Sequence, residues 1–179
     1  MVPSSRLQSW RSRRQRERRD REVTEGLRRI AFPVYGLPAA WEARRTVGGS
    51  SWGGPTGVVG VTLSHEIGDG ARSLEVRVTT RFAHTSGVED LEEEVEIDFG
   101  LRSPDEQGSD RTRLEWMRMR IPVEGERTDF EVIAGREGQW GAVGAVGEVA
   151  VAIEVRNFAM ADVVLERVTD IEPYLAGSL

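Results

Sequence analysis

The 179-residue chain contains no cysteine and no lysine. Without cysteine it has no disulfide, no thiol nucleophile and no thiolate ligand for zinc, and stabilisation by a core alone suits a reducing compartment. Without lysine it cannot form a Schiff base or supply the lysine of a phosphate-binding loop. These two absences exclude several classes of enzyme and predict a cytoplasmic protein.

Long apolar runs are also missing. No stretch approaches the roughly eighteen consecutive apolar residues that a membrane-spanning helix needs. The residues after Met1 and Val2 are polar and then densely charged, unlike the apolar centre of a secretory signal. We therefore expect a soluble protein with no membrane partner.

Charge divides the chain into two parts. Residues 1–30 contain 10 arginines and 4 acidic residues, whereas residues 31–179 contain 14 arginines and 26 acidic residues. Arg, Gln and Glu favour helix, and neither Gly nor Pro interrupts residues 5–25. The sequence thus predicts a basic helical arm over residues 1–30 and an acidic domain over residues 31–179.

The clearest local pattern is the alternation of apolar and polar residues over 58–82, which predicts two strands. Asp69 and Gly70 lie between them, and Asp-Gly is a favoured two-residue hairpin turn. If those two residues form the turn, Leu63 lies opposite Val76, and the apolar residues of both strands share one face. Turn chemistry and patterning thus agree on the register.

Further strands are predicted over residues 128–134 and 148–156, and another over 112–123, with either a bulge near Trp116 or a Trp116 side chain that covers the far face. Met117, Met119 and Ile121 are expected to point inward. The acidic segment 88–99 alternates apolar and acidic residues at its end, which predicts that it ends as a strand with Glu94, Glu96 and Asp98 facing solvent; a helical turn at its beginning stays open.

Segments rich in Gly or Pro surround these strands. Residues 31–41 are expected to be extended and packed on the core, and residues 47–57 to form a loop anchored by Trp52. Residues 138–147 are a glycine-rich strand or loop. The sequence after Asn157 predicts a helix that Pro173 ends, with a strand over residues 163–168 as the alternative.

Together these elements predict an α+β fold. We expect a single domain with an antiparallel sheet of about five or six strands, an N-terminal Arg-rich helix and a C-terminal helix. A parallel sheet is disfavoured, because no helix of useful length separates the central strands.

Motifs for catalysis are weak. The sequence Gly-Ser-Ser-Trp-Gly at 49–53 matches a nucleophile elbow, but the glycines and proline that follow prevent the helix which that motif requires. The two histidines, His65 and His84, would lie about 33 Å apart along the predicted hairpin, at about 3.3 Å per residue, and so could not share a metal. His65 is interpreted as a half-buried residue opposite Leu74. The glycines of 138–147 lack the order of a dinucleotide-binding motif.

The acidic run in 88–98 is the densest in the chain, and it lacks the pattern of a calcium loop. Its simplest interpretation is pairing across strands with Arg118 and Arg120. We predict no catalytic residue, no cofactor and no metal site. Four of the tryptophans are interpreted as core and loop anchors, although a cluster of them around a cavity would indicate a small ligand: Trp41, Trp52, Trp116 and Trp140.

The arm has three interpretations: a solvated helix, a contact to nucleic acid, or a contact to an acidic protein surface. An acidic domain repels nucleic acid, which favours the third. We therefore expect a non-enzymatic cytoplasmic protein-interaction protein of the accessory or inhibitor type, with a protein partner or self-association; the alternative is a nucleic-acid- or ribonucleoprotein-associated protein that binds through the arm. The predicted contact residues are Trp10, Arg11, Arg13, Arg14, Arg16, Arg18, Arg19 and Arg21 of the arm and Glu92, Glu94, Glu96 and Asp98 of the acidic strand.

Overall fold

The computed structural model describes residue 21 and residues 24–52, 57–68, 73–83, 87–101, 115–136 and 138–177. The chain separates into two compact units, Met1–Ala31 and Phe32–Leu179. Of the first unit, residues 24–27 are helical. No helix of the described residues is long and apolar enough to cross a membrane.

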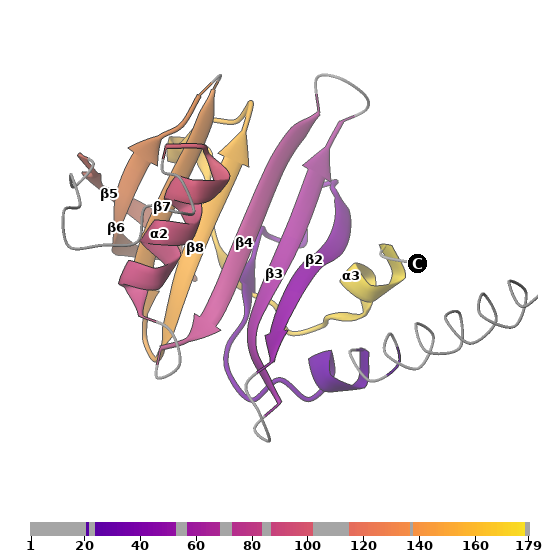
Figure 1. The fold of residues 1–179 in the computed structure, drawn as a ribbon. Coiled ribbons are helices and arrows are strands. Elements are labelled where there is room, and N and C mark those ends of the chain that lie inside the picture. The colour runs from indigo at the N-terminus through magenta and orange to yellow at the C-terminus, as the bar shows by residue number, and fades with distance from the viewer. Residues whose placement is uncertain are drawn as a thin grey trace, which may run out of the picture. The chain divides into compact units, whose positions relative to one another are not determined.

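The second unit is an α+β domain built on a seven-stranded antiparallel sheet (Figure 1). The predicted antiparallel sheet is thus confirmed, with more strands than expected. In spatial order the strands are β2 (Arg44–Trp52), β3 (Val58–Ile67), β4 (Leu74–Phe82), β8 (Val149–Arg156), β7 (Gln139–Val146), β6 (Glu126–Ala134) and β5 (Met117–Val123). The main helix, α2 (Val88–Asp98), follows β4 in the chain, and the chain then returns from the far edge of the sheet to β8, beside β4.

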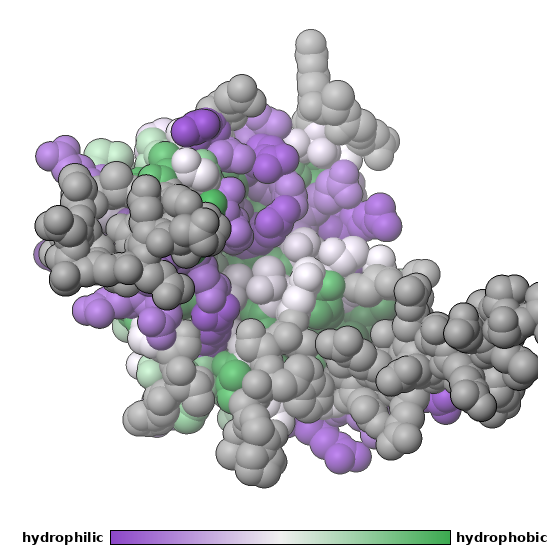
Figure 2. All heavy atoms as spheres, viewed as in Figure 1, coloured by the Kyte–Doolittle hydropathy of each residue, from purple (hydrophilic) through white to green (hydrophobic). Residues whose placement is uncertain are grey.

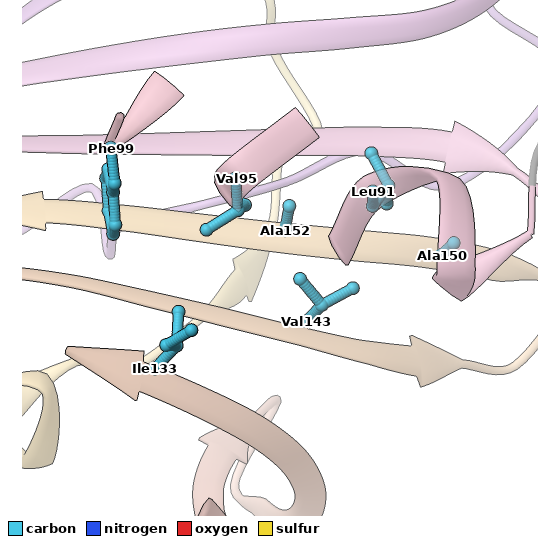
Figure 3. Packing of buried hydrophobic residues seen from close by; sticks show 7 residues of the cluster. All are labelled: Leu91, Val95, Phe99, Ile133, Val143, Ala150 and Ala152. Carbon is cyan, nitrogen blue, oxygen red and sulfur yellow. The ribbon is translucent and has the colours of Figure 1, made fainter. Parts of the chain in front are cut away.

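Helix α2 covers one face of the sheet mainly over β8 and β7, and Ile133 of β6 joins the same cluster (Figure 1). Leu91, Val95 and Phe99 lie at intervals of four residues and are buried against the small residues Ala150 and Ala152 (Figure 3). Such spacing places one side chain of each helical turn on the sheet. The small sheet residues leave the space that the helix occupies.

The opposite face carries the larger core. Alternate residues of β3, β4 and β8, such as Leu63, Val78 and Ile153, are fully buried there in one row across the strands. Two segments distant in sequence cover them. They meet in the small sheet of β1 (Tyr35–Gly36) and β9 (Glu166–Arg167).

Several local predictions were wrong. The hairpin pairs Leu63 with Val78 and not with Val76, because six residues, and not Asp69-Gly70 alone, separate β3 from β4. The shift is two residues, the period of a strand, so the apolar face was still predicted correctly. Residues 47–52, predicted as a loop, belong to β2, whereas the glycine-rich 139–146 is β7, one of the two alternatives predicted for it. Met117, predicted to point inward, is 54% exposed at the start of the edge strand β5.

The predicted C-terminal helix is replaced by three short elements: the 3-10 helix η3 (Met160–Asp162), β9 and helix α3 (Glu172–Gly177). Asn157 has φ of 57° and forms a turn after β8, not the cap of a helix. Within residues 163–168, the alternative strand, only Glu166–Arg167 is a strand, and Val163 and Leu165 before it are buried in the core. Pro173 begins α3, where its missing N–H leaves no bond unmade.

Candidate functional site

A polar cleft lies on the helix-covered face of the sheet, where α2 leaves β4, β3 and β2 open. Its volume is about 700 Å³. Figure 2 shows hydrophilic residues gathered over α2 and paler residues of intermediate hydropathy over the neighbouring strands. The described residues that line it include hydroxyl side chains, carboxylates and two arginines: Thr46, Thr62, Ser64, Ser73, Thr79, Glu66, Glu75, Glu94, Asp98, Glu154, Arg44 and Arg77. We call this the acidic cleft.

Strand alternation builds the floor of the acidic cleft. Leu63 and His65 of β3 point to the buried core on the far face, so Thr62 and Ser64 between them face the cleft. The hydroxyls of Thr62 and Thr79 lie 2.9 Å apart and form a hydrogen bond across the β3–β4 pair. The floor is therefore polar although the strands that form it are apolar on their other side.

Helix α2 forms one wall. Glu94 and Asp98 are four residues apart and therefore point to the same side of the helix, towards the open half of the sheet. Glu94 forms an ion pair with Arg81 of β4. This pair links the helix to the strand beside the cleft.

The charges of the acidic cleft are only partly paired. Arg77 donates to Glu75 over 2.8 Å, and an Arg44 nitrogen lies 4.0 Å from a Glu66 oxygen. The side-chain carboxylates of Asp98 and Glu154 form no hydrogen bond and no ion pair within 4 Å among the described residues, although the charge of Arg77 acts on both. The cleft thus holds two carboxylates whose hydrogen-bonding capacity is not used within the described parts of the chain.

Glu154 is the most perturbed of these groups. It follows Ala150 and Ala152 on the helix-facing side of β8 and lies opposite Arg77 on β4. Burial raises its pKa from 4.5 to about 7, and the negative charges of Asp98, Glu75 and Glu94 contribute, while Arg77 opposes the rise. A carboxyl group in this state can give up a proton when a cation approaches it.

His65 is also among the described residues that line the cleft, but its ring nitrogens contact Val76, Leu37 and Tyr174, none of which lines it. The ring was predicted to be half-buried opposite Leu74, but it is fully buried opposite Val76. Its Nδ1 lies 3.3 Å from the Val76 carbonyl oxygen, and its Nε2 accepts from the Leu37 amide at 3.2 Å and lies 3.0 Å from the Tyr174 hydroxyl. Burial lowers the pKa of His65 to about 4, so the ring is neutral and serves to join β3 to both terminal segments.

The predicted acidic strand is helix α2, which changes the position of each predicted contact residue. Glu94 and Asp98 line the cleft, whereas Glu96 is buried, 4% exposed, and accepts from the Trp116 indole at 3.1 Å. Glu92 is half-buried and does not line the cleft. The proposed pairing of this run with two arginines of β5 was also wrong: Arg118 pairs with Glu131 and Arg120 with Asp129, both on β6.

The contact residues predicted in the arm lie outside the described residues, except Arg21, which is exposed. They are Trp10, Arg11, Arg13, Arg14, Arg16, Arg18 and Arg19. The structure therefore neither brings them to the acidic residues nor separates them.

Sequence reasoning missed Glu154, Glu75 and Arg77. The sequence does contain a signal for Glu154, because it is the only charged residue in the otherwise apolar run 149–155. A charged side chain in a buried strand is costly unless it is paired or has a function. The tryptophans form no cluster around the cleft: no tryptophan is among its described lining residues. Trp41 packs against Phe158 with ring centroids 5.5 Å apart.

Among the described residues, no three His, Asp or Glu side chains converge in a way that could hold a metal ion. Comparisons with protein-family models, curated proteins and solved structures found no match to this chain. The geometry of the acidic cleft must therefore carry the functional argument.

Proposed function

We propose that this chain is a non-enzymatic protein-interaction protein, of the accessory or inhibitor type, whose acidic cleft holds an arginine-rich segment of a protein partner. The observation that carries the proposal is the pair of carboxylates, Asp98 and Glu154, which form no side-chain hydrogen bond or ion pair among the described residues in a cleft of about 700 Å³. Pockets of about 300 to 1,000 Å³ are typical of binding sites.

The chemistry of the cleft favours a guanidinium group. A guanidinium presents planar pairs of N–H donors that match a carboxylate, and it loses less on leaving water than an ammonium group. The threonine and serine hydroxyls of the floor accept further hydrogen bonds from a peptide. Of the charged residues described in the lining, 5 are acidic and 2 are basic, so an anionic ligand would be repelled.

The test is the binding of a fluorescent oligo-arginine peptide to the full chain, followed by anisotropy. We expect binding that weakens about tenfold when Asp98→Asn and Glu154→Gln are combined. The matched control combines Glu126→Gln and Glu148→Gln, which replaces the same number of carboxyl groups at exposed positions, the start of β6 and the turn before β8, outside the cleft. If both variants lost affinity for oligo-arginine equally, net charge alone would explain the binding, and the proposal would be overturned.

The same assay addresses nucleic acid as the alternative partner. A single-stranded RNA oligonucleotide that binds the full chain, loses affinity steeply with salt and is unaffected by the cleft substitutions would assign the function to the basic arm. Under our proposal the oligonucleotide does not bind at about 150 mM salt, because the acidic domain repels it.

A further inference from the structure

We propose that the segment held in the acidic cleft is the arm of a second copy of this chain, residues 10–21, so that copies assemble by exchanging arms. The inference rests on the proposed function and adds the identity of the partner. It requires no contact beyond the cleft already described.

Charge complementarity supports this occupant. Residues 10–21 contain 7 arginines and 2 acidic residues. The acidic cleft carries the opposite imbalance, and the carboxylates of Asp98 and Glu154 line it without a side-chain hydrogen bond or ion pair among the described residues. A segment so rich in guanidinium groups is the ligand within this sequence whose chemistry fits the cleft.

The path of the chain favours a second copy over the same one. The acidic domain begins with the segment around Tyr35 and Leu37, whose amides donate to Thr80 Oγ1 and to His65 Nε2, each over 3.2 Å. Thr80 and His65 are fully buried on the face of the sheet opposite the cleft, where they alternate with the cleft residues Thr79 and Ser64. The acidic domain thus begins on the face opposite its own cleft, whereas the cleft of a second copy can be approached without passing around the edge of the sheet.

Reciprocal exchange would give each pair of copies two identical contacts related by a two-fold axis. Once the first arm is seated, the second binds within the same complex, so two weak electrostatic contacts give a more stable dimer than either contact alone. Both contacts are electrostatic and should weaken together as salt is raised.

The experiment is a complementation test by sedimentation velocity. The arm variant carries Arg13→Gln, Arg16→Gln and Arg18→Gln, and the cleft variant carries Asp98→Asn and Glu154→Gln. At about 50 mM salt the unchanged chain should sediment as a dimer or larger species, and at about 500 mM salt as a monomer. Each variant alone should be monomeric, and an equimolar mixture should recover a dimer, since one intact arm and one intact cleft remain. Thermal unfolding of each variant checks that it is folded.

The possible failures are distinguishable. A monomeric unchanged chain at low salt, or a dimer that persists in both variants, would overturn arm exchange. If the chain is monomeric but oligo-arginine still binds the cleft, the proposed function stands and the partner is another protein. If neither association is observed, both proposals fall.

Discussion

Two buried groups are predicted to give this protein opposing dependences of stability on pH. His65 has a folded-state pKa of about 4, below its ordinary 6.5, whereas Glu154 has a folded-state pKa of about 7, above its ordinary 4.5. Between pH 4 and 6.5 the unfolded chain binds the proton at His65 and the folded chain does not, so stability rises with pH. Between pH 4.5 and 7 the folded chain holds the proton at Glu154 and the unfolded chain does not, so stability falls as pH rises.

The two effects should nearly cancel. Each displacement spans a similar pH interval, and at about 1.4 kcal/mol per pH unit each amounts to about 3 kcal/mol of unfolding free energy. From these two groups alone, the unchanged chain should therefore show little change between pH 4.5 and 6.5. In the variant Glu154→Gln only the dependence of His65 remains, and the unfolding free energy should rise by about 3 kcal/mol from pH 4.5 to 7.

Urea unfolding followed by tryptophan fluorescence at several pH values measures this difference. An independent check is the proton NMR titration of the His65 ring in a His84→Gln chain, which leaves a single imidazole signal. A folded-state titration of His65 near pH 6.5 would refute the argument from burial. So would a Glu154→Gln variant whose pH dependence matches that of the unchanged chain.

Three further outcomes are expected. A methyl group at Gly141 would meet the Val95 side chain, so Gly141→Ala should lower the unfolding free energy by about 1 to 3 kcal/mol in urea titrations, by displacing α2. Trp116→Phe removes the indole donor to the buried Glu96 and should cost about 1 to 3 kcal/mol in the same assay, a loss absent from the exposed control Glu126→Gln. Binding of oligo-arginine should release a proton from Glu154, so calorimetric heats at pH 7 should depend on the ionisation enthalpy of the buffer, and this dependence should vanish in Glu154→Gln.

The hairpin of β3 and β4 shows what a strand pattern can and cannot predict. Alternation determines which side chains share a face, and Leu63 and Val78 do share one. It does not determine register to better than two residues, because a shift by one strand period leaves every side chain on its face. A two-residue turn at Asp69-Gly70 predicts one register. Six residues separate β3 from β4 instead, so the actual register differs by two residues.

Helix α2 was missed because two periodicities overlap in one segment. Val95, Ile97 and Phe99 have the spacing of a strand, whereas Leu91, Val95 and Phe99 have that of a helix. The structure adopts the second, and the residues that permit it are Gly141, Ala150 and Ala152, which are small enough for a helix to pack on the strands. Their sequence distance from the helix is too large for a local pattern to include them.

The acidic cleft depends on the same small residues. Gly141 and Ala152 leave space for α2 on one half of the sheet. The threonines of β3 and β4 make the other half polar, which disfavours packing of an apolar helix there. The helix edge therefore stands beside an open polar surface, and its outward acidic residues face that surface. The acidic residues could be identified from the sequence. The cleft could not, because it forms only where α2 covers one part of the sheet and leaves the rest open.

Glu154 connects this architecture to the proposed function. A carboxyl group at the edge between the covered and the open half of the sheet is partly removed from water, and folding the ionised form costs about 3 kcal/mol by the displacement of its pKa. Another small residue in line with Ala150 and Ala152 would avoid that cost and extend the packing surface of α2. A cationic ligand offsets the same cost, because a guanidinium beside Glu154 stabilises the ionised form that burial disfavours. Glu154 lowers the stability of the isolated domain, and under the proposed function an arginine-rich segment in the cleft would offset that loss by stabilising the ionised carboxylate.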